Sequence, residues 1–328
     1  MDIDIIIPWV NGNDPEWIKE FNKYCKDEKS IIDSSNVRYR DNGLLKYWFR
    51  GIEKFAPWVR KVHFVTCGQK TTWLNTNAPK LHCVEHSHYI PGQYLPVFSS
   101  HPIELMMHKI PDLSEHFIYF NDDFFLTAPV SKDFFFKNGL PRDAAVFNAI
   151  SVGEMMGHIQ LNNITEINKH FNKYSVIKHH CTKFINPIYG FDLLRTIMLM
   201  PWPKFTGFNI YHFAQPYTKT LLYEVWEKCE DMLNNTMNSR FRSKNDVNQW
   251  LFQYWNMCSG NFYPTKLIKK RKYYSLKDDI NIITNVIKKQ KYKEIVINDE
   301  YCNDYESRII KIQNAFESIL PEKSIYEL

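Results

Sequence analysis

HFIYFNDDFFL, at residues 116–126, sets an amide and two adjacent carboxylates directly against an apolar run. The segment FIYF (117–120) is typical of a strand, so Asn121, Asp122 and Asp123 are expected at the carboxyl end of that strand. Burying a carboxylate is unfavourable unless a cation or hydrogen bonds replace its lost hydration. The stretch therefore indicates either a tight acidic turn or a place where something positively charged binds.

The chain before this stretch alternates predicted strands and predicted helices. Strands are predicted for IDIIIPWV (3–10), KVHFVTC (61–67) and KLHCVEH (80–86). Helices are predicted after a cap at Asn13 or Asp14, over LLKYWFRGIEKFA (44–56) and over IELMMHKI (103–110). The helices are recognised by apolar residues at helical spacing and by capping residues. This alternation is typical of an α/β protein with a parallel sheet.

The rest of the chain is predicted to add further helices and one more strand. Between Leu140 and Pro203 no clear period is visible, and we interpret this part as a largely helical insertion. Helices are expected at 218–235, 244–258 and 304–319, and a strand within KEIVINDE (293–300). These patterns divide the chain into a Rossmann-like half at 1–130, a helical insertion at 131–205 and a second half at 206–328.

Composition indicates a folded protein whose partners are not nucleic acids. With 328 residues, of which 44% are hydrophobic and 23% charged, the chain can bury a large core. The aromatic content of 16% suits clefts whose rings stack on sugars or bases, and a net charge of +5 is too diffuse to indicate a nucleic-acid binder. Two basic runs are interpreted as solvated faces or as sites for an anionic membrane surface or polymer, namely KLIKKRK (266–272) and KKQKYK (288–293).

Cysteine usage and the start of the chain bear on the compartment. Seven scattered cysteines, without a CxxC pair, indicate reduced thiols. Asp2 and Asp4 stand where a signal peptide would carry basic residues, and no apolar run reaches the length of a membrane-spanning helix. We therefore expect a cytoplasmic protein, with the inner face of the cell membrane as an alternative place of work.

Polar residues follow several of the predicted strands, where ligands bind in open α/β sheets. After the first strand come Asn11, Gly12 and Asp14, and after the second come Gly68 and Gln69. The late strand EIVI runs into Asn298 and Asp299, as FIYF runs into Asn121 and the two aspartates. Two strands that each end in Asn-Asp would suit one hard divalent cation such as Mg²⁺. A plain acidic turn remains the alternative.

Arginines stand shortly before two predicted helices, and several histidines are candidates for a base or a metal ligand. Arg38 and Arg40 stand beside Asp41 and Asn42 before a predicted helix, and Arg240 and Arg242 stand before Asp246. The arginines suit phosphate binding or ordinary surface ion pairs, and the polar residues suit helix caps. His212 is either a core residue or a general base. The histidine-rich tracts 82–88 and 179–181 match no standard zinc spacing.

Several long motifs, taken together, resemble the Stealth family. Its first two conserved regions resemble PWVNGNDPEW (8–17), RYRDNGLLKYWFRGIEKFAPWVRKVHFVTCGQ (38–69), LPVFSSHPIE (95–104) and LSEHFIYFNDD (113–123). Its third region resembles NIYHFAQPYTK (209–219) and SRFRSKNDV (239–247), and its fourth resembles KEIVINDE (293–300) and LPEKSIYEL (320–328). The motifs keep the family's order and reach both ends of the chain.

The resemblance implies a sugar-1-phosphate transferase with one catalytic domain, residues 1–328. Its fold would be Rossmann-like (GT-A-like), with a mostly parallel sheet flanked by helices and a largely helical insertion. A UDP-sugar would be the donor, and Mg²⁺ (or Mn²⁺) the metal, held by Asp123 and Asp299. By motif position the catalytic set is Glu104, Asp123, His212 and Arg242. The residues expected to bind substrate are Trp9, Asn11, Gly12, Asp14, Arg40, Asp41, Asn42, Gln69, Ser99 and Arg240.

In the reaction that the resemblance implies, a hydroxyl of a polysaccharide or lipid-linked glycan attacks the phosphorus that carries the sugar. This forms a phosphodiester and releases UMP, as in capsular or cell-wall polysaccharide synthesis. Positioning and charge neutralisation carry most of the catalysis in phosphoryl transfer. His212 and Glu104 both stay open as the general base. The alternatives are a metal-dependent glycosyltransferase that releases UDP, an inactive polysaccharide- or membrane-binding module, and a nucleic-acid binder.

Overall fold

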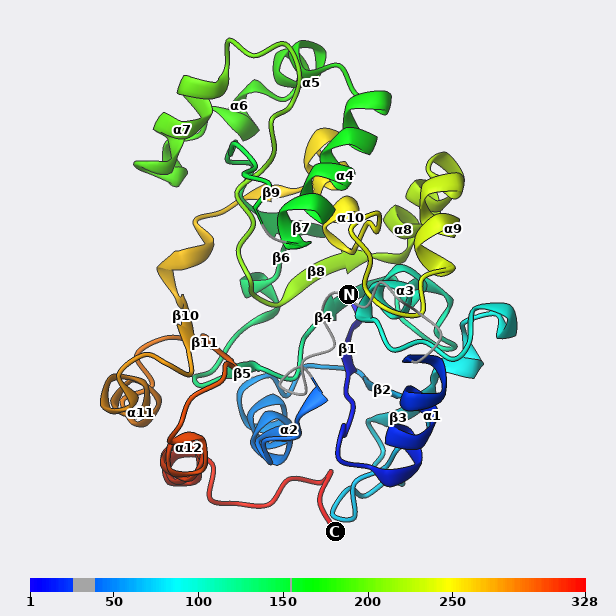
Figure 1. The fold of residues 1–328 in the computed structure, drawn as a ribbon. Helices are drawn as coiled ribbons and strands as arrows, with labels where there is room; N and C mark the ends of the chain where they lie inside the picture. Colours follow the sequence, from blue (N-terminus) through cyan, green and yellow to red (C-terminus); the bar gives the residue numbers. More distant parts are fainter. Residues whose placement is uncertain (26–38, 154) are drawn as a thin grey trace.

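The main sheet of the protein has five strands in the order β3-β2-β1-β4-β8 (Figure 1). A computed structural model describes residues 1–25, 39–153 and 155–328, so Arg38, which the sequence places beside Asp41 and Asn42, lies outside the described residues. The strands are β1 (Ile3–Pro8), β2 (Val62–Thr66), β3 (Leu81–Glu85), β4 (His116–Tyr119) and β8 (Gln215–Thr218). The first four are parallel and β8 runs antiparallel to β4. The predicted α/β, mostly parallel fold is confirmed.

Alternating side chains of β1 supply both layers of the core. Ile5 and Ile7 belong to the cluster that also contains Trp48 and Phe49 of helix α2 (Leu45–Phe55). Ile6 belongs to a second cluster, on the other face, which includes the helices after β8. A strand buried on both faces reads as a continuous apolar run, which explains the sequence IDIIIP.

The predicted first helix and its cap are confirmed. Helix α1 (Pro15–Cys25) begins directly after Asp14, whose Oδ1 accepts hydrogen bonds from the backbone N–H groups of Glu16 (2.9 Å) and Trp17 (3.3 Å). These bonds satisfy N–H groups that have no partner within the helix itself, and proline fits the first helical position.

A second sheet starts where β4 ends. Strand β5 (Phe124–Leu126) follows the acidic turn 121–123 and joins a three-stranded sheet of order β10-β11-β5. Its partners are β11 (Glu294–Asn298), antiparallel to β5, and β10 (Arg271–Ser275). The strand predicted at 293–300 is therefore present, but it lies outside the main sheet. The acidic turn is the link between the two sheets.

The insertion is largely helical, as predicted, and lies at the end of the molecule away from helix α12 (Figure 1). It opens with short strands β6 (Phe136–Lys137) and β7 (Leu140–Asp143), which form a small sheet with β9 (Tyr263–Pro264). The helices that follow are α4 (Met155–His170), α5 (Lys173–His179), α6 (Cys181–Phe184) and α7 (Asp192–Leu199). The boundaries at residues 130 and 205 stay a prediction.

Three predicted helices differ from the observed ones. The helix expected at 218–235 is divided at Cys229, whose backbone leaves the helical region (φ −122°, ψ 26°), into α8 (Lys219–Lys228) and α9 (Glu230–Met237). The helix expected at 244–258 begins only at Trp250, as α10 (Trp250–Cys258). The segment 103–110 is split between α3 (Ser100–Leu105) and a 3₁₀ turn (Met107–Lys109). Helices α11 (Ile280–Lys288) and α12 (Tyr305–Ile319) complete the chain.

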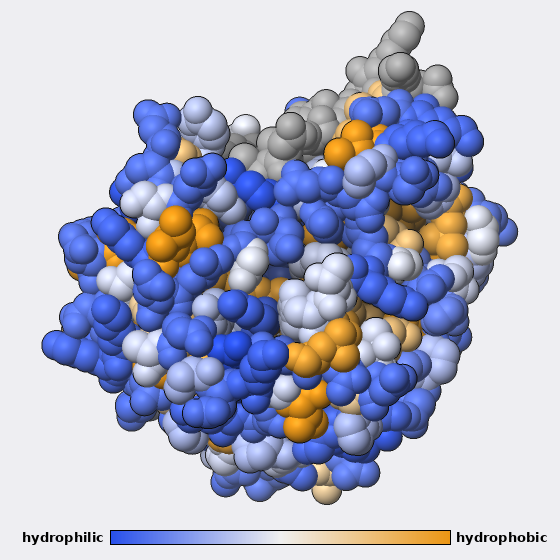
Figure 2. All heavy atoms as spheres, turned by 90° about the horizontal axis from the view of Figure 1, so that it is seen from below, coloured by the Kyte–Doolittle hydropathy of each residue, from blue (hydrophilic) through white to orange (hydrophobic). Residues whose placement is uncertain are grey.

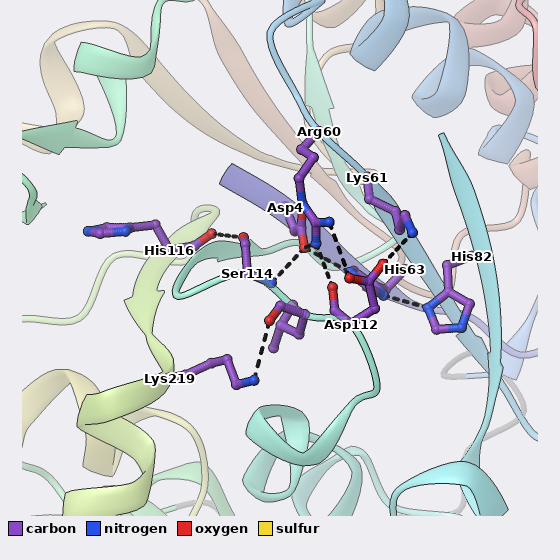
Figure 3. A network of polar contacts seen from close by, with 10 residues as sticks. Asp4, Arg60, Lys61, His63, His82, Asp112, Ser114, His116 and Lys219 are labelled. Atoms are coloured by element: carbon purple, nitrogen blue, oxygen red, sulfur yellow. Dashed lines mark hydrogen bonds and ion pairs between the residues drawn. The ribbon is translucent and has the colours of Figure 1, made fainter. Parts of the chain in front are cut away.

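A buried carboxylate at the amino end of β1 is fully paired. Asp4 is inaccessible to solvent, and its two oxygens bind the Arg60 guanidinium at 2.8 and 2.5 Å (Figure 3). Asp4 Oδ2 also accepts from the backbone N–H of Ser114 at 2.7 Å and lies 3.0 Å from His63 Nε2. Hydrogen bonds of this number and charge compensate for the lost hydration of the carboxylate. This network ties β1, β2 and the approach to β4 together.

The cysteines and the helix lengths bear on the predicted compartment. All seven cysteines are free, which agrees with the prediction of reduced thiols. Each helix in the described ranges is too short or too polar to cross a bilayer.

Candidate active site

A cavity of about 930 Å³ opens beyond the carboxyl ends of β1 and β4. Trp9 and Val10 follow β1 into its wall, and the acidic turn 121–123 follows β4. The second sheet supplies Tyr273 and Asn298 from the opposite side. The cavity therefore lies at the junction of the two sheets, where ligands are expected in an open α/β fold.

Many of the predicted site residues line this cavity together, although they are widely separated in the sequence. They are Trp9, Arg40, Asn42, Ser99, Glu104, Asp123, His212, Arg242 and Asp299. Their catalytic and binding roles stay predictions.

The acidic turn carries more negative charge than its neighbours balance. Asp123 Oδ2 lies 3.6 Å from His212 Nε2, and Asp123 Oδ1 is buried with no hydrogen-bond partner among the described residues. Asp122 is accessible to water in the cavity, but the surrounding protein atoms and the charge of Asp123 raise its pKa to about 7. An unpartnered carboxylate oxygen next to a second carboxylate favours a bound cation.

His212 is held against the turn by aromatic contacts. The ring of Phe124 meets it edge-on at 4.8 Å, and Tyr273 does so at 6.0 Å. Burial works to lower the pKa of His212, but the carboxylate of Asp123 outweighs burial, so the pKa is raised. The acidic turn therefore raises the pKa of His212, and the side chain is 33% exposed and lines the cavity. Its role as a general base stays a prediction.

Glu104 presents a carboxylate oxygen without a partner to the same cavity. It lies on α3 and is 4% exposed. Its Oε1 accepts a hydrogen bond from the Tyr119 hydroxyl at 2.8 Å, whereas Oε2 has no partner among the described residues. Ser99 caps α3 through its hydroxyl, which accepts from His101 N–H at 3.3 Å. Arg242 donates to the neighbouring hydroxyl of Ser100 at 3.1 Å, which places the guanidinium beside Glu104's helix.

Asp299 lines the cavity together with the guanidinium of Arg40, with which it forms an ion pair. Arg40 donates from Nε and Nη2 to its two oxygens at 3.0 and 2.7 Å, and the guanidinium stacks on Tyr305 at 3.4 Å. Burial raises the pKa of Asp299, and Arg40 opposes that effect. The backbone N–H of Ile297 donates to the carbonyl of Asp123 at 3.0 Å, so β11 delivers Asp299 next to the acidic turn. The two aspartates converge as predicted, and their role as metal ligands stays a prediction.

Four of the predicted binding residues form the loop after β1 and its neighbour after β2. Asn11 N–H donates to the Gln69 side chain, and Gln69 donates back to the Asn11 carbonyl, both at 2.9 Å. A Cβ at Gly12 would lie 2.5 Å from Tyr39 Cβ, so only glycine permits this approach. Asp14 and Gln69 line a second cavity of about 680 Å³, which shares Trp17 and Cys67 with the first.

Asp41, Asn42 and Arg240, the other predicted binding residues, interact with residues close to them. Asp41 accepts from Gly43 N–H at 3.0 Å and Asn42 from Leu44 N–H at 3.0 Å, which shapes the turn before α2. The helix cap itself is Leu44, which has no side-chain cap bond. Arg240 lies over the ring of Tyr24 at 4.9 Å. Of these residues, Asn42 lines the main cavity.

Sequence reasoning missed a buried pair in the wall of the cavity. His101 Nδ1 lies 2.9 Å from Asp246 Oδ2, and both residues are almost fully buried. Asp246 also accepts from Ser243 N–H at 2.9 Å, so it braces the loop that carries Arg242 and does not cap α10. The signal was present in the motif SSHPIE, where a histidine stands beside the predicted catalytic glutamate.

Among the described residues, one group of three metal-ligating side chains stands elsewhere: Glu166, His170 and Cys229. Glu166 accepts from Lys169 Nζ at 2.5 Å and lies 3.1 Å from His170 Nε2. Its charge is therefore already balanced by neighbours on α4. The tracts 82–88 and 179–181 contribute no such group. The unpartnered oxygen of Asp123 makes the acidic turn the better place for a divalent cation.

A mostly parallel sheet whose strand ends open on carboxylates, arginines and a histidine defines an α/β enzyme of GT-A-like architecture. The sequence matches two conserved regions of Stealth proteins, conserved region 1 over residues 1–25 and conserved region 2 over residues 38–144. The chain is also 41% identical to a capsular polysaccharide phosphotransferase, with 99% of this chain and 98% of that relative aligned. The chain belongs to the Stealth family, and it is a transferase.

Its similarity to named relatives extends over nearly the whole chain. It is 41% identical to capsular polysaccharide phosphotransferase WcwK of Streptococcus pneumoniae, with 99% of this chain and 98% of the relative aligned. It is 38% identical to exopolysaccharide phosphotransferase cps2G of Lactiplantibacillus plantarum, with 99% and 96% aligned. It is 38% identical to receptor polysaccharide phosphotransferase WefC of Streptococcus gordonii, with 99% of both chains aligned. The resemblance of later segments to the third and fourth regions stays a prediction.

Proposed function

We propose that the enzyme transfers a hexose 1-phosphate from a UDP-sugar to a hydroxyl of a glycan, forming a phosphodiester and releasing UMP. The names of the relatives support phosphotransfer in capsular or exopolysaccharide synthesis. The acceptor in this proposal is a polysaccharide or a lipid-linked glycan. The observation that carries the proposal is the acidic turn, where a carboxylate oxygen of Asp123 has no partner and His212 lies alongside. Such a reaction would take place where UDP-sugars are made, in the cytoplasm.

The cavity suits a nucleotide sugar in size and chemistry. Its volume of about 930 Å³ lies at the upper end of the usual range for small-molecule sites, about 300–1,000 Å³. Trp9, Trp17 and Phe98 offer aromatic faces for a base or sugar, and Arg242 offers donors for phosphate oxygens. The adjoining cavity beside Gln69 extends the space toward α1.

A divalent cation, Mg²⁺ or Mn²⁺, fits the acidic turn. Asp123 would hold it with Asp299, whose oxygens now bind Arg40. The ion would supply charge neutralisation on the pyrophosphate of the donor. Arg40, freed in part from Asp299, would remain beside the phosphates as a second source of positive charge.

The proposed step can be written with every bond accounted for. The acceptor hydroxyl forms a bond to the phosphorus that bears the sugar, while the bond from that phosphorus to the bridging oxygen of UMP breaks. His212 Nε2 accepts the hydroxyl proton, and Arg242 stabilises charge on the transferring group. The bond between the sugar and its phosphate oxygen is untouched, so the anomeric configuration is kept. Glu104 is the alternative base, since the residue lines the same cavity and its Oε2 has no hydrogen-bond partner among the described residues.

Product analysis separates this proposal from a glycosyltransferase. The enzyme is incubated with Mg²⁺, a panel of UDP-sugars and candidate glycan acceptors, and the released nucleotide is identified by chromatography. UMP together with a phosphodiester signal in the ³¹P NMR spectrum of the product supports the proposal. UDP together with a phosphate-free glycoside contradicts it and favours the glycosyltransferase. Turnover of neither kind across the panel, in a protein that binds UDP-sugar, would favour the binding module.

A further inference from the structure

Helix α7 and its flanking turns expose an unusual concentration of large apolar side chains. The set comprises Ile185 (42% exposed), Ile188 (43%), Phe191 (90%), Leu194 (56%), Ile197 (51%), Met198 (74%) and Trp202 (53%), and we call it the α7 surface. It lies at the end of the molecule away from α12 (Figure 1). Isolated exposed apolar residues are common, but a contiguous group of this kind marks an interaction surface.

Helix α7 exposes large apolar side chains on its outer face, while Leu193 and Leu199 pack on the core clusters from its inner face. Phe191, Leu194 and Met198 follow one another at helical spacing and face solvent. Thr196, in contrast, is fully buried, and its hydroxyl accepts a hydrogen bond from Phe147 N–H at 3.1 Å. A surface helix of a globular protein usually has charged and polar residues on its outer face, so the exposed apolar side chains of α7 are not needed for the folding of this chain.

Buried polar contacts hold this surface in place. Lys173 is 1% exposed, and its ammonium donates to the carbonyls of Leu199, Met200 and Trp202 at 2.7, 3.1 and 2.6 Å. These bonds fix the end of α7 and the turn that carries Trp202. At the other end, Asp192 accepts a hydrogen bond from the Tyr211 hydroxyl at 3.1 Å. Because Tyr211 precedes His212, the α7 surface is tied to the wall of the main cavity.

The surroundings of the α7 surface are basic. Between Phe171 and Lys204 the acidic residue is Asp192, already bonded to Tyr211, whereas the basic residues are Lys173, Lys178, Lys183, Arg195 and Lys204. Lys178, Arg195 and Lys204 are exposed. The ammonium of Lys266 also approaches Gly190, just before α7, since a Cβ there would lie 3.2 Å from it. Apolar side chains bordered by exposed cations match an anionic amphipathic surface.

The opposite end of the molecule is different. Seen from below, the protein is mainly hydrophilic, and its hydrophobic residues form small separate groups (Figure 2). Exposed apolar residues such as Ile282 (54%) and Ile310 (55%) lie on α11 and α12, which are distant from α7 in Figure 1. Large apolar side chains bordered by exposed cations are therefore a feature of the α7 surface, although exposed basic residues also occur in the runs 266–272 and 288–293.

We infer that the α7 surface docks the enzyme on an anionic lipid bilayer, with its apolar side chains in the interface and its basic residues against lipid phosphates. A second copy of the chain fits less well, because a symmetric contact would place the lysines and Arg195 of one copy against those of the other. A helix with exposed apolar side chains and neighbouring basic residues is the kind of element that lies in a membrane interface. This inference does not depend on the identity of the donor or of the transferred group.

Vesicle co-sedimentation of the full chain tests the docking. Vesicles of phosphatidylglycerol and of phosphatidylcholine are compared, for the wild type, for the double variant F191S/M198S and for the matched control I282S/I310S. We expect the wild type and the control to bind phosphatidylglycerol alike, and the double variant to bind at least about tenfold more weakly, since two large apolar side chains are lost. R195E should weaken binding to phosphatidylglycerol and leave the weaker phosphatidylcholine binding unchanged.

Two results would overturn the inference. One is equal binding of the wild type and F191S/M198S to phosphatidylglycerol, with circular dichroism showing both folded. The other is a wild-type dimer in light scattering that F191S/M198S converts to a monomer, which would make the α7 surface an interface between copies. Both assays are independent of turnover, so a failure of the proposed reaction leaves them readable.

Discussion

The carboxylates at the two ends of the main sheet differ in how completely they are paired. At the amino end, Asp4 is completely buried and binds Arg60, His63 and the backbone of Ser114. At the carboxyl end, Asp123 has one oxygen without a partner and the other 3.6 Å from His212. Both aspartates adjoin parallel strands of the same sheet, so the strands themselves do not account for the difference.

The pKa values follow the same contrast. Burial works to raise the pKa of Asp4, but hydrogen bonds from His63 and Arg60 outweigh it and lower the pKa. At the carboxyl end, the surrounding protein atoms and the charge of Asp123 both raise the pKa of Asp122, to about 7. The amino end therefore stabilises the fold, whereas the carboxyl end retains uncompensated charge at the expense of stability. Such local conflict is expected where a site is kept for function.

Removing the charge of Asp123 should give the largest effect. We expect Asp123→Asn to lower turnover roughly a thousandfold, because the residue that organises charge in the cavity is lost. The melting temperature should stay the same or rise, because the ion pair of this carboxylate with His212 is long, at 3.6 Å, and its other oxygen has no partner among the described residues. Steady-state kinetics and thermal unfolding measure the two effects. Asp133→Asn, which removes a surface carboxylate paired with Lys137, serves as the control.

Removing the charge of Asp4 should lower stability and leave turnover unchanged. We expect Asp4→Asn to lower the free energy of unfolding by roughly 3 kcal/mol, because the buried partners of the carboxylate lose their counter-charge. Turnover per folded molecule should be retained. Urea unfolding and active-site-normalised kinetics test this expectation. A variant that unfolds like the wild type would remove the assignment of a structural role to the amino-end network.

The stabilising effect of Asp4 should also depend on pH in a definite direction. Because the pKa of Asp4 is lower in the folded than in the unfolded protein, its contribution is present above the unfolded value, about 3.9, and is lost as the pH falls through the folded value. The difference in unfolding free energy between the wild type and Asp4→Asn should therefore be constant near neutral pH and shrink below about pH 4. A constant difference down to pH 3 would contradict the pairing.

The two candidate bases can be separated by a smaller effect. We expect His212→Ala to lower turnover about a hundredfold, the usual contribution of a general base, and Glu104→Gln to lower it less. Glu104→Gln keeps the shape of the side chain and the bond from Tyr119, so it isolates the charge. Kinetics with saturating donor measure both variants. The reverse order of losses would assign the proton to Glu104.

The smallest effect is expected for Asp122→Asn, and it should appear in the free energy of unfolding. Because its pKa is about 7 when folded and near 4 when unfolded, the folded protein loses stability as the pH rises between these values. With water in the cavity screening the charge, Asp122→Asn should gain about 1 kcal/mol at pH 8 and nothing at pH 4. Thermal unfolding in the presence of a chelator measures the gain. Equal stability of both proteins at pH 8 would show that the turn is not strained by charge.

The sequence predicts strands β1 to β4 of the main sheet because they are largely apolar and bounded by clear turns. The Asp14 cap and α2 follow from local patterns for the same reason. Strand β8, whose sequence is QPYT, was not predicted. The placement of β11 beside β5 could not be predicted, because the sequence of an apolar strand does not indicate which strand it pairs with. The break at Cys229 was also hidden, since the residues on both sides of it favour helix.

Within the site, the residues Asp123, His212 and Asp299, which were predicted by motif position, line one cavity. The bidentate bond from Arg40 to Asp299 and the reciprocal bonds of Asn11 and Gln69 were not predictable, because they join residues that meet only through tertiary packing. The outward apolar face of α7 was equally hidden, because its spacing reads like that of a helix with a buried face.

Titration with Mn²⁺, followed by electron paramagnetic resonance of the free ion, tests the central contrast most directly. The wild type and Asp133→Asn should bind one Mn²⁺ per chain with the same affinity, and Asp123→Asn should bind it at least about tenfold more weakly. Binding by Asp123→Asn with wild-type affinity would contradict the assignment of the acidic turn as the cation site.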